Sequence, residues 1–405
     1  MSQPGGFEQQ PTSHVCRLNK SLYGLKQALR AWNEKFTTFL PSLGFKPSYA
    51  DPSLFVLISG SSKVYLLLYV DDIIITGNSE NLIGEVKSSL QAEFDMSDLG
   101  PLHFFLGLEI KYMKNGDVFV SQQKYASEVI HKTGLDSCHS QITPCQSGLK
   151  LIKDMGQQLD KQDSAHFRSI VGCLQYLTFT RPDIAYSVNL VCQFMHCPTY
   201  THLNAAKRIL RYIKGTLDYG IWFRRGQTTK KFSLSPIKMD AYCDADWAGD
   251  PNDRKSTTGF VILLEGTPVS WCSKKQTAVS RSSTEAEYRS MADTTSEVKW
   301  LLHLMQDLHI EVLDKPTLHC DNISALALAT NPVFHSKLKH IEVDVHFTRD
   351  QVKAGTIKLK FVGSKEQLAD LFTKGLCSPQ HRYLCDSLKL VSHLQAEEGY
   401  YENKV

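Results

Sequence analysis

The chain has 405 residues, of which 42% are hydrophobic and 21% are charged, and its formal net charge is +3. This length allows two or three domains with cores of their own, and the composition excludes a disordered or fibrous protein. The 11 cysteines include no Cys-x-x-Cys pair, and neither a membrane-length apolar run nor a signal-peptide core is present. We therefore expect a soluble protein of a reducing compartment, cytoplasmic or nuclear, without a membrane partner.

Residues 16–36 predict an amphipathic helix, because apolar side chains recur there at spacings of three and four. These side chains are Leu22, Leu25, Leu29, Trp32 and Phe36. The opposite face of the predicted helix is basic.

Two apolar runs, 64–70 and 73–77, flank the adjacent Asp71 and Asp72. Carboxylates inside a pair of hydrophobic strands are costly, so we expect them at the turn of a β-hairpin, where metal can balance their charge. A Tyr-Val-Asp-Asp string alone is an accident in most proteins, and its meaning depends on the flanking strands.

Residues 97–123 suggest a second hairpin, with Asn115 and Gly116 as its two-residue turn. The pattern over 124–220 is mostly helical, apart from a polar stretch at 141–161 that we expect to be a loop.

The segment 205–231 contains eight Lys or Arg against the single acid Asp218, with aromatic residues interleaved. This composition predicts a surface that follows phosphates and stacks on bases. The candidate contacts on it are Lys207, Arg208, Arg211 and Lys214. A solvated helix face is the alternative.

Three aspartates, Asp240, Asp244 and Asp246, are separated by four and by two residues on a predicted strand and therefore share one face of it. No Lys or Arg occurs from 241 to 249 to pair with them. A bound cation is the favoured partner, although the spacing does not choose among the three acids.

Three more acids follow in separate predicted elements. Glu285 opens a long amphipathic helix, Asp321 ends a short apolar strand, and Asp370 stands on a late helix. Each has a structural alternative: a capping box with Ser282, a helix N-cap, and a surface acid, respectively. The histidines His335, His340 and His346 lack a further ligand at zinc spacing, so no zinc site is predicted.

The order of these acids, with strands at 257–264 and 268–272 after the first, resembles the ribonuclease H domain of copia-type LTR retrotransposons. Residues 16–36 and the Tyr-Val-Asp-Asp hairpin resemble the reverse transcriptase of the same Pol polyprotein, although the family usually has Pro where Leu29 stands. The resemblance implies an α/β fold class: an α+β palm remnant with a helical thumb or connection, then a ribonuclease H-like mixed sheet flanked by helices.

The resemblance also divides the chain into four parts. They are a truncated reverse transcriptase palm with the hairpin (1–130), a basic, mostly helical thumb or connection (131–235), a ribonuclease H domain (236–376) and a C-terminal tail (377–405).

Asp244, Glu285, Asp321 and Asp370 are the catalytic and metal-binding residues that the resemblance implies, with Glu287 as the competitor of Glu285. Two Mg²⁺ ions, or Mn²⁺, would act there on the RNA strand of an RNA–DNA hybrid, which its 2′-hydroxyls distinguish from DNA. Candidates for contacts with the nucleic-acid backbone are Lys274, Lys275 and Arg281.

Asp71 and Asp72 resemble two of the three metal-binding aspartates of a polymerase palm. In the family the third precedes the motif that remains here as residues 3–7, so we expect RNA-directed DNA synthesis to be lost, although template-primer nucleic acid is still an expected partner. The main alternative is a catalytically inactive, element-derived nucleic-acid-binding protein. A junction resolvase or an integrase core shares the fold, but would not follow a palm and thumb.

Overall fold

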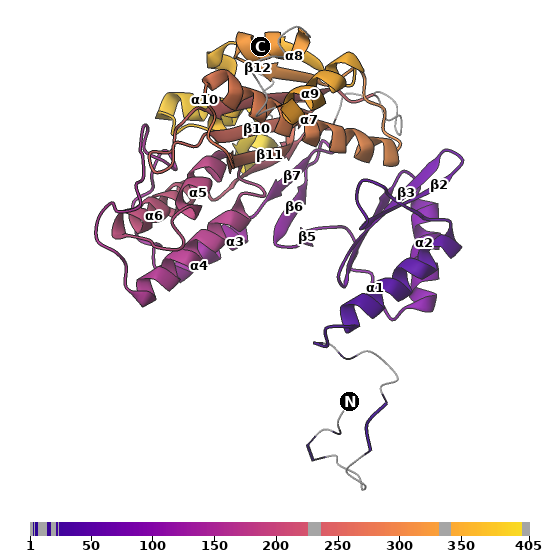
Figure 1. The fold of residues 1–405 in the computed structure, drawn as a ribbon. Helices are drawn as coiled ribbons and strands as arrows, with labels where there is room; N and C mark the ends of the chain where they lie inside the picture. Colours follow the sequence, from indigo (N-terminus) through magenta and orange to yellow (C-terminus); the bar gives the residue numbers. More distant parts are fainter. Residues whose placement is uncertain are drawn as a thin grey trace. The chain divides into compact units, whose positions relative to one another are not determined.

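A computed structural model gives the fold, and the structure describes residues 3, 5–6, 14–17, 22, 24–225, 236–331 and 342–398. The chain divides into two compact units, residues 1–100 with 306–309 and residues 101–305 with 310–405, which are described separately (Figure 1). Within the described ranges no helix is long and apolar enough to cross a membrane. The end of the basic segment, 226–231, and the histidines His335 and His340 lie outside the described residues.

The first unit contains a four-stranded antiparallel sheet in the order β1-β2-β3-β4. Its strands are β1 (Lys46–Pro47), β2 (Leu54–Ser59), β3 (Ser62–Tyr69) and β4 (Asp72–Gly77). Its helices are α1 (Ala28–Phe39), the 3₁₀ helix η1 (Leu40–Leu43) and α2 (Glu80–Glu93). Phe36 of α1, Leu66 of β3 and Leu90 of α2 are all fully buried in one core, so both helices pack their apolar faces on the sheet.

The helix predicted at 16–36 begins only at Ala28 among the described residues and continues to Phe39. Gly24 has a φ of +88°, a left-handed conformation that interrupts a helix just before this point. Leu29 is 52% exposed, so the predicted apolar stripe is only partly correct. Trp32 does pack, with its ring 5.4 Å from that of Phe94.

The second unit includes a five-stranded antiparallel sheet in the order β14-β8-β7-β6-β5. Its strands are β5 (Phe104–Phe105), β6 (Leu108–Tyr112), β7 (Val118–Ser121), β8 (Tyr219–Phe223) and β14 (Leu390–Ser392). Strands β6 and β7 form the hairpin predicted at 97–123, but residues 113–117 connect them, so the predicted two-residue turn at Asn115 and Gly116 is wrong. The last strand, β14, comes from near the end of the chain and ties that region to β8.

A helical layer follows β7 in the sequence. It consists of α3 (Gln123–Lys132), α4 (Lys161–Leu177), the 3₁₀ helix η2 (Pro182–Ile184), α5 (Ala185–Cys192) and α6 (Tyr200–Lys214). Phe167 and Leu210 are fully buried in its core, which confirms the helical pattern. The stretch predicted as a loop has no helix before Lys161 and only an isolated bridge at Gln158.

The same unit contains a mixed five-stranded sheet in the order β11-β10-β9-β12-β13. Its strands are β9 (Met239–Asp246), β10 (Thr257–Leu264), β11 (Thr267–Lys275), β12 (Thr317–Cys320) and β13 (Lys358–Phe361). β9 pairs antiparallel with β10 and parallel with β12, so it is the central strand. Helix α7 (Ser283–Asp307) packs on this sheet, with the Ser290 hydroxyl donating to the carbonyls of Asp244 at 2.8 Å and Gly259 at 3.2 Å.

The remaining elements are α8 (Ile323–Thr330), α9 (Glu342–Lys353), the 3₁₀ helices η4 (Ser364–Glu366) and η5 (Leu368–Phe372), α10 (Ser378–Ser387) and α11 (His393–Glu397). The prediction of a tail after 376 needs correction, because α10 and β14 pack into the fold. Leu384 and Leu388 of this segment are fully buried, together with Phe372. The fold class is confirmed, while the domain boundaries at 130 and 235 stay predictions.

Candidate active site

Asp244 lies near the end of the central strand β9 and is only 2% exposed. It stands opposite Gly259 of β10, where an added Cβ would lie 2.6 Å from Thr373 and 2.8 Å from Phe372. The absence of a side chain at Gly259 therefore lets η5 and the residue after it pack directly on the strand pair. The Thr373 hydroxyl donates to the Asp244 carboxylate and fixes its orientation.

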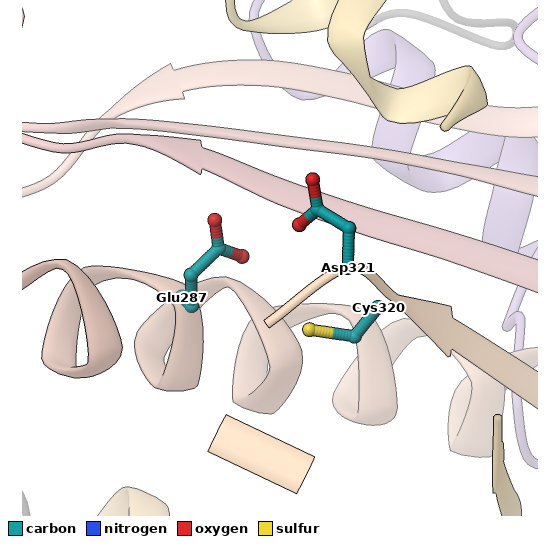
Figure 2. Close-up of side chains that lie close together, drawn as sticks. All are labelled: Glu287, Cys320 and Asp321. Atoms are coloured by element: carbon teal, nitrogen blue, oxygen red, sulfur yellow. The ribbon is translucent and has the colours of Figure 1, made fainter. Parts of the chain in front are cut away.

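Glu287 and Asp321 meet from two different elements, α7 and the residue that follows β12 (Figure 2). With Cys320, they offer ligand atoms that all lie within 4.8 Å of one another. Glu287 and Cys320 are buried and Asp321 is half-buried. In Figure 2 the two carboxylates turn toward the same space.

Glu285 is turned away from this group, so its predicted place as a metal ligand needs correction. Its Oε2 atom accepts the backbone N–H of Arg281 at 2.9 Å, and its Oε1 atom accepts from Arg289 at 3.0 Å. Residues two apart on an α-helix point about 200° apart, so only one of Glu285 and Glu287 can face this edge of the sheet. The structure gives that position to Glu287.

We call Asp244, Glu287, Asp321 and Asp370 the acidic cluster, because their electrostatic interactions connect them. Burial raises the pKa of Glu287 well above its usual range, and Asp244 and Asp321 raise it further. Burial and then Asp244 also raise the pKa values of Asp321 and Asp370. Charge on any one of these carboxylates therefore opposes charge on the others.

Lys374 supplies a positive charge to the acidic cluster. Its Nζ atom lies 2.5 Å from a carboxylate oxygen of Asp370 and 3.3 Å from one of Asp244. Burial alone would lower the pKa of Lys374, but the two carboxylates raise it, so the side chain is an ammonium ion. Asp370 lies in the short 3₁₀ helix η5 and is 8% exposed, which excludes the alternative of a surface acid.

The other two aspartates of β9 have different surroundings. Asp240 pairs with His319 at 3.0 Å and with Lys238 at 2.7 Å, and these partners lower its pKa. Asp246 is half-buried, and burial raises its pKa. Of the three acids that share the strand face, Asp244 is the one that contributes to the acidic cluster.

Three of the basic residues predicted on α6 bind the chain itself. They donate hydrogen bonds to residues 138–143, from Lys214 at 2.6 Å, Arg211 at 2.7 Å and Arg208 at 3.0 Å, and Lys214 also donates to the carbonyl of Asp136. These bonds hold a loop against α6 without neutralising the three charges, and the predicted phosphate-binding surface stays a prediction. In the part of the chain that the structure describes, Lys207 has no such bond.

The basic residues predicted near the active site differ in whether they form ion pairs. Lys275 pairs with Asp250 and, at 3.0 Å, with Asp253. Lys274 and Arg281 are exposed, and neither side chain has a hydrogen bond or ion pair to another described residue. Lys274 and Arg281 therefore remain available to an incoming ligand.

Asp71 and Asp72 lie at the tip of the β3–β4 hairpin, in the first unit. Tyr69 pairs with Asp72, which leaves Val70 and Asp71 as a two-residue turn. Both carboxylates are exposed. Val70 has a φ of +52°, and the Trp32 indole N–H donates to its carbonyl at 2.8 Å.

A divalent cation fits the acidic cluster. The Glu287 Oε2 atom is buried and has no hydrogen-bond partner among the described residues, a costly arrangement unless a cation or a proton satisfies it. Carboxylate oxygens are the ligands that Mg²⁺ and Mn²⁺ prefer, whereas a thiol such as that of Cys320 suits softer metals.

Comparison with known proteins identifies the family of the chain. The profile of the family described as "Reverse transcriptase (RNA-dependent DNA polymerase)" matches residues 1–147. The retrovirus-related Pol polyprotein from transposon RE1 of Arabidopsis thaliana is 46% identical over 377 residues, which are 93% of this chain and 25% of that protein. The uncharacterized mitochondrial protein AtMg00810 of the same plant is 46% identical over 58% of this chain and 94% of its own length.

Among solved structures, the foamy viral protease-reverse transcriptase in complex with RNA/DNA hybrid is 12% identical, with a TM-score of 0.43 over 85% of this chain and 39% of that one. A TM-score this low supports no conclusion about this chain. The chain spans about a quarter of the length of the Pol polyproteins that it matches. On the sequence identities, the chain belongs to the family of copia-type retrotransposon Pol polyproteins.

Proposed function

We propose that this chain is a retrotransposon-derived ribonuclease H that hydrolyses the RNA strand of RNA–DNA hybrids with two Mg²⁺ ions, or with Mn²⁺. The observation that carries the proposal is the buried, unpartnered Oε2 atom of Glu287 within the acidic cluster. Four carboxylates gathered from β9, α7, the end of β12 and η5 need cations or protons to balance their charge, and Lys374 supplies a single positive charge.

The members of the acidic cluster would hold the ions, and Glu287 would be the metal ligand that was predicted at Glu285. When bound, the ions lower the pKa of the attacking water and stabilise the leaving 3′ oxygen, which leaves a 5′ phosphate and a 3′ hydroxyl. Thr373 holds Asp244 in position, and Lys374 keeps a positive charge beside Asp244 and Asp370. That charge favours approach of the phosphodiester to the site.

The nucleic-acid backbone would be bound by Lys274, Arg281 and Lys207, whose charges are not committed to other described residues. Each phosphate that they neutralise releases counterions, so binding should weaken as salt increases. Arg208, Arg211 and Lys214 contribute by holding the 138–143 loop in place.

The 405-residue chain by itself should not copy RNA into DNA. Its hairpin supplies only Asp71 and Asp72, and the other acid of this sheet region, Asp51, uses its carboxylate to accept the N–H of Ser53 at 2.9 Å. A two-metal polymerase site with a ligand missing loses several orders of magnitude in rate. Primer extension with Mg²⁺ should stay at background, and efficient templated synthesis would contradict this.

The nuclease proposal is tested with the purified full chain. With Mg²⁺ it should cut the RNA strand of a labelled hybrid and leave a DNA duplex intact, and Asp244→Asn should abolish the cutting while circular dichroism shows an unchanged fold. A chain that binds the hybrid but cuts nothing is the alternative, an inactive nucleic-acid-binding protein. Cutting by Asp244→Asn at the wild-type rate would refute the assignment of the site.

A further inference from the structure

A pocket of about 180 Å³ lies beside the acidic cluster, between the helical layer and the turn that follows β9. Its walls come from two parts of the second unit. The loop between α3 and α4 supplies Lys150, α5 supplies Tyr186 and Asn189, and the region of the mixed sheet supplies Asp246, Thr257 and Lys374. Lys374 belongs both to this pocket and to the acidic cluster, so the pocket opens next to the proposed reaction centre.

The helical side of the pocket presents polar groups that are not used elsewhere. Within the ranges that the structure describes, the side chains of Lys150 and Asn189 make no hydrogen bond or ion pair. Lys150 is exposed and near enough to Asp246 to lower its pKa, while Asn189 is half-buried on α5. An amide held half-buried without a partner loses hydrogen bonds to water unless a ligand restores them.

The chemistry of the pocket suits a ribonucleotide. Lys150 carries a positive charge that can pair with a phosphate, and the Asn189 amide can both donate to and accept from a ribose hydroxyl. Leu149, Leu151 and Leu190 add apolar surface for the sugar and base. A second acid of the wall, Asp250, is already paired with Lys275, so its charge does not repel the phosphate.

We infer that this pocket binds the ribonucleotide next to the scissile phosphate on the cleaved strand, with Lys150 on its phosphate and Asn189 on its 2′-hydroxyl. The inference rests on the proposed ribonuclease H function and adds a source of its preference for RNA. Residues outside the ribonuclease H-like sheet then help to choose the strand that is cut. The helical layer is in this way part of the substrate site as well as a support for the sheet.

The test uses the full chain and a set of hybrids in which single nucleotides of the RNA strand are replaced by 2′-deoxynucleotides, one position at a time. The wild-type chain should lose about tenfold in affinity at one position, since an unpaired polar group in the site costs about 1–2 kcal/mol. Asn189→Ala should bind the hybrid with the deoxynucleotide at that position as tightly as it binds the unmodified hybrid. Lys150→Gln should raise KM and reduce the salt dependence of binding, with little change in kcat.

Matched controls separate these effects from those of removing any positive charge or any amide group from the surface. Lys161→Gln, at the exposed start of α4, and Asn81→Ala, on the exposed face of α2, should behave as wild type. Affinities measured with Ca²⁺ compare the variants even if no cutting occurs. A failure of the nuclease proposal is therefore distinguishable from a failure of the inference about the pocket. The inference is overturned if Asn189→Ala keeps the wild-type sensitivity to deoxy substitution.

Discussion

The chain carries two sets of carboxylates for which we predict metal binding, and their surroundings differ. Asp71 and Asp72 stand exposed at a hairpin tip, where water solvates their charges. Asp244 and Glu287 are buried and interact electrostatically with Asp321 and Asp370. The hairpin can therefore form without a cation, whereas in the acidic cluster the binding of a cation and the stability of the fold are linked.

The largest expected effect concerns the two glutamates of α7. Glu287→Gln should lower hybrid cleavage by roughly a thousandfold or more, because it removes a ligand of the proposed metal site. Glu285→Gln makes the same chemical change two residues away, and should keep most of the activity. Rates from single-turnover cleavage in Mg²⁺ decide between them.

A reversed result would be informative. If Glu285→Gln is inactive and Glu287→Gln is active, the orientation of α7 is wrong by about half a turn. Circular dichroism of both variants serves as the folding control, because Glu285 also caps the start of α7 through Arg281.

The choice between these glutamates shows the limit of prediction from sequence. The resemblance that rests on the order of strands and acids implied the mixed sheet and a common site for Asp244, Asp321 and Asp370. It did not determine which face of α7 meets the sheet, since that depends on packing between distant segments. A helical projection offers one signal: Glu287 shares a face with the buried Ser290 and Met291, whereas Glu285 is four residues from Arg289, a spacing that favours a salt bridge.

The contacts that the basic face of α6 makes within the chain were not predicted, for a related reason. Lys214 and Arg211 have the sequence pattern of a phosphate-binding surface, and nothing local reveals that residues 138–143 fold back onto them. The 3₁₀ form of η5 was missed too, because a five-residue segment gives too little periodicity to distinguish it from an α-helix. Contacts between distant segments determined what the local patterns could not.

The pH dependence of stability should differ between the two acidic regions. The pKa of Glu287 is raised in the folded chain, so the folded state binds a proton that the unfolded chain has released above about pH 4.3. This contribution to stability is complete below that pH and is lost as pH rises toward the folded pKa. Without metal, Glu287→Gln should therefore become progressively more stable than the wild-type chain from pH 5 to pH 8.

Urea denaturation at several pH values, in the presence of a chelator, measures this difference. Asp72→Asn at the exposed hairpin provides the matched control, and its stability relative to wild type should change little over the same range. If the free energies of unfolding of the wild-type chain and Glu287→Gln differ by the same amount at every pH, the glutamate is not buried among like charges.

Addition of Mg²⁺ should stabilise the fold through the acidic cluster and not through the hairpin, and this effect is expected to be smaller than the pH effect. A ligand that binds only the folded state raises its stability by about 2.7 kcal/mol at a hundredfold excess over its Kd. The midpoint of thermal unfolding should rise with Mg²⁺ for the wild-type chain and for Asp71→Asn, and much less for Asp244→Asn. An equal rise in all three chains would show that the ion binds outside the acidic cluster.

The smallest expected effect lies in the backbone of the hairpin. Val70 holds a φ of +52°, which costs a β-branched residue roughly 1–2 kcal/mol, and the Trp32 indole helps to keep it there. Val70→Gly removes this strain, but glycine loses about 0.5–1 kcal/mol more conformational entropy on folding. The net gain should be about 0.5 kcal/mol, seen as slower amide hydrogen exchange in β3 and β4. Val70→Ala keeps a Cβ at the same φ and should gain less, so an equal gain from both variants would mean that branching, rather than the left-handed conformation, is the source of the strain.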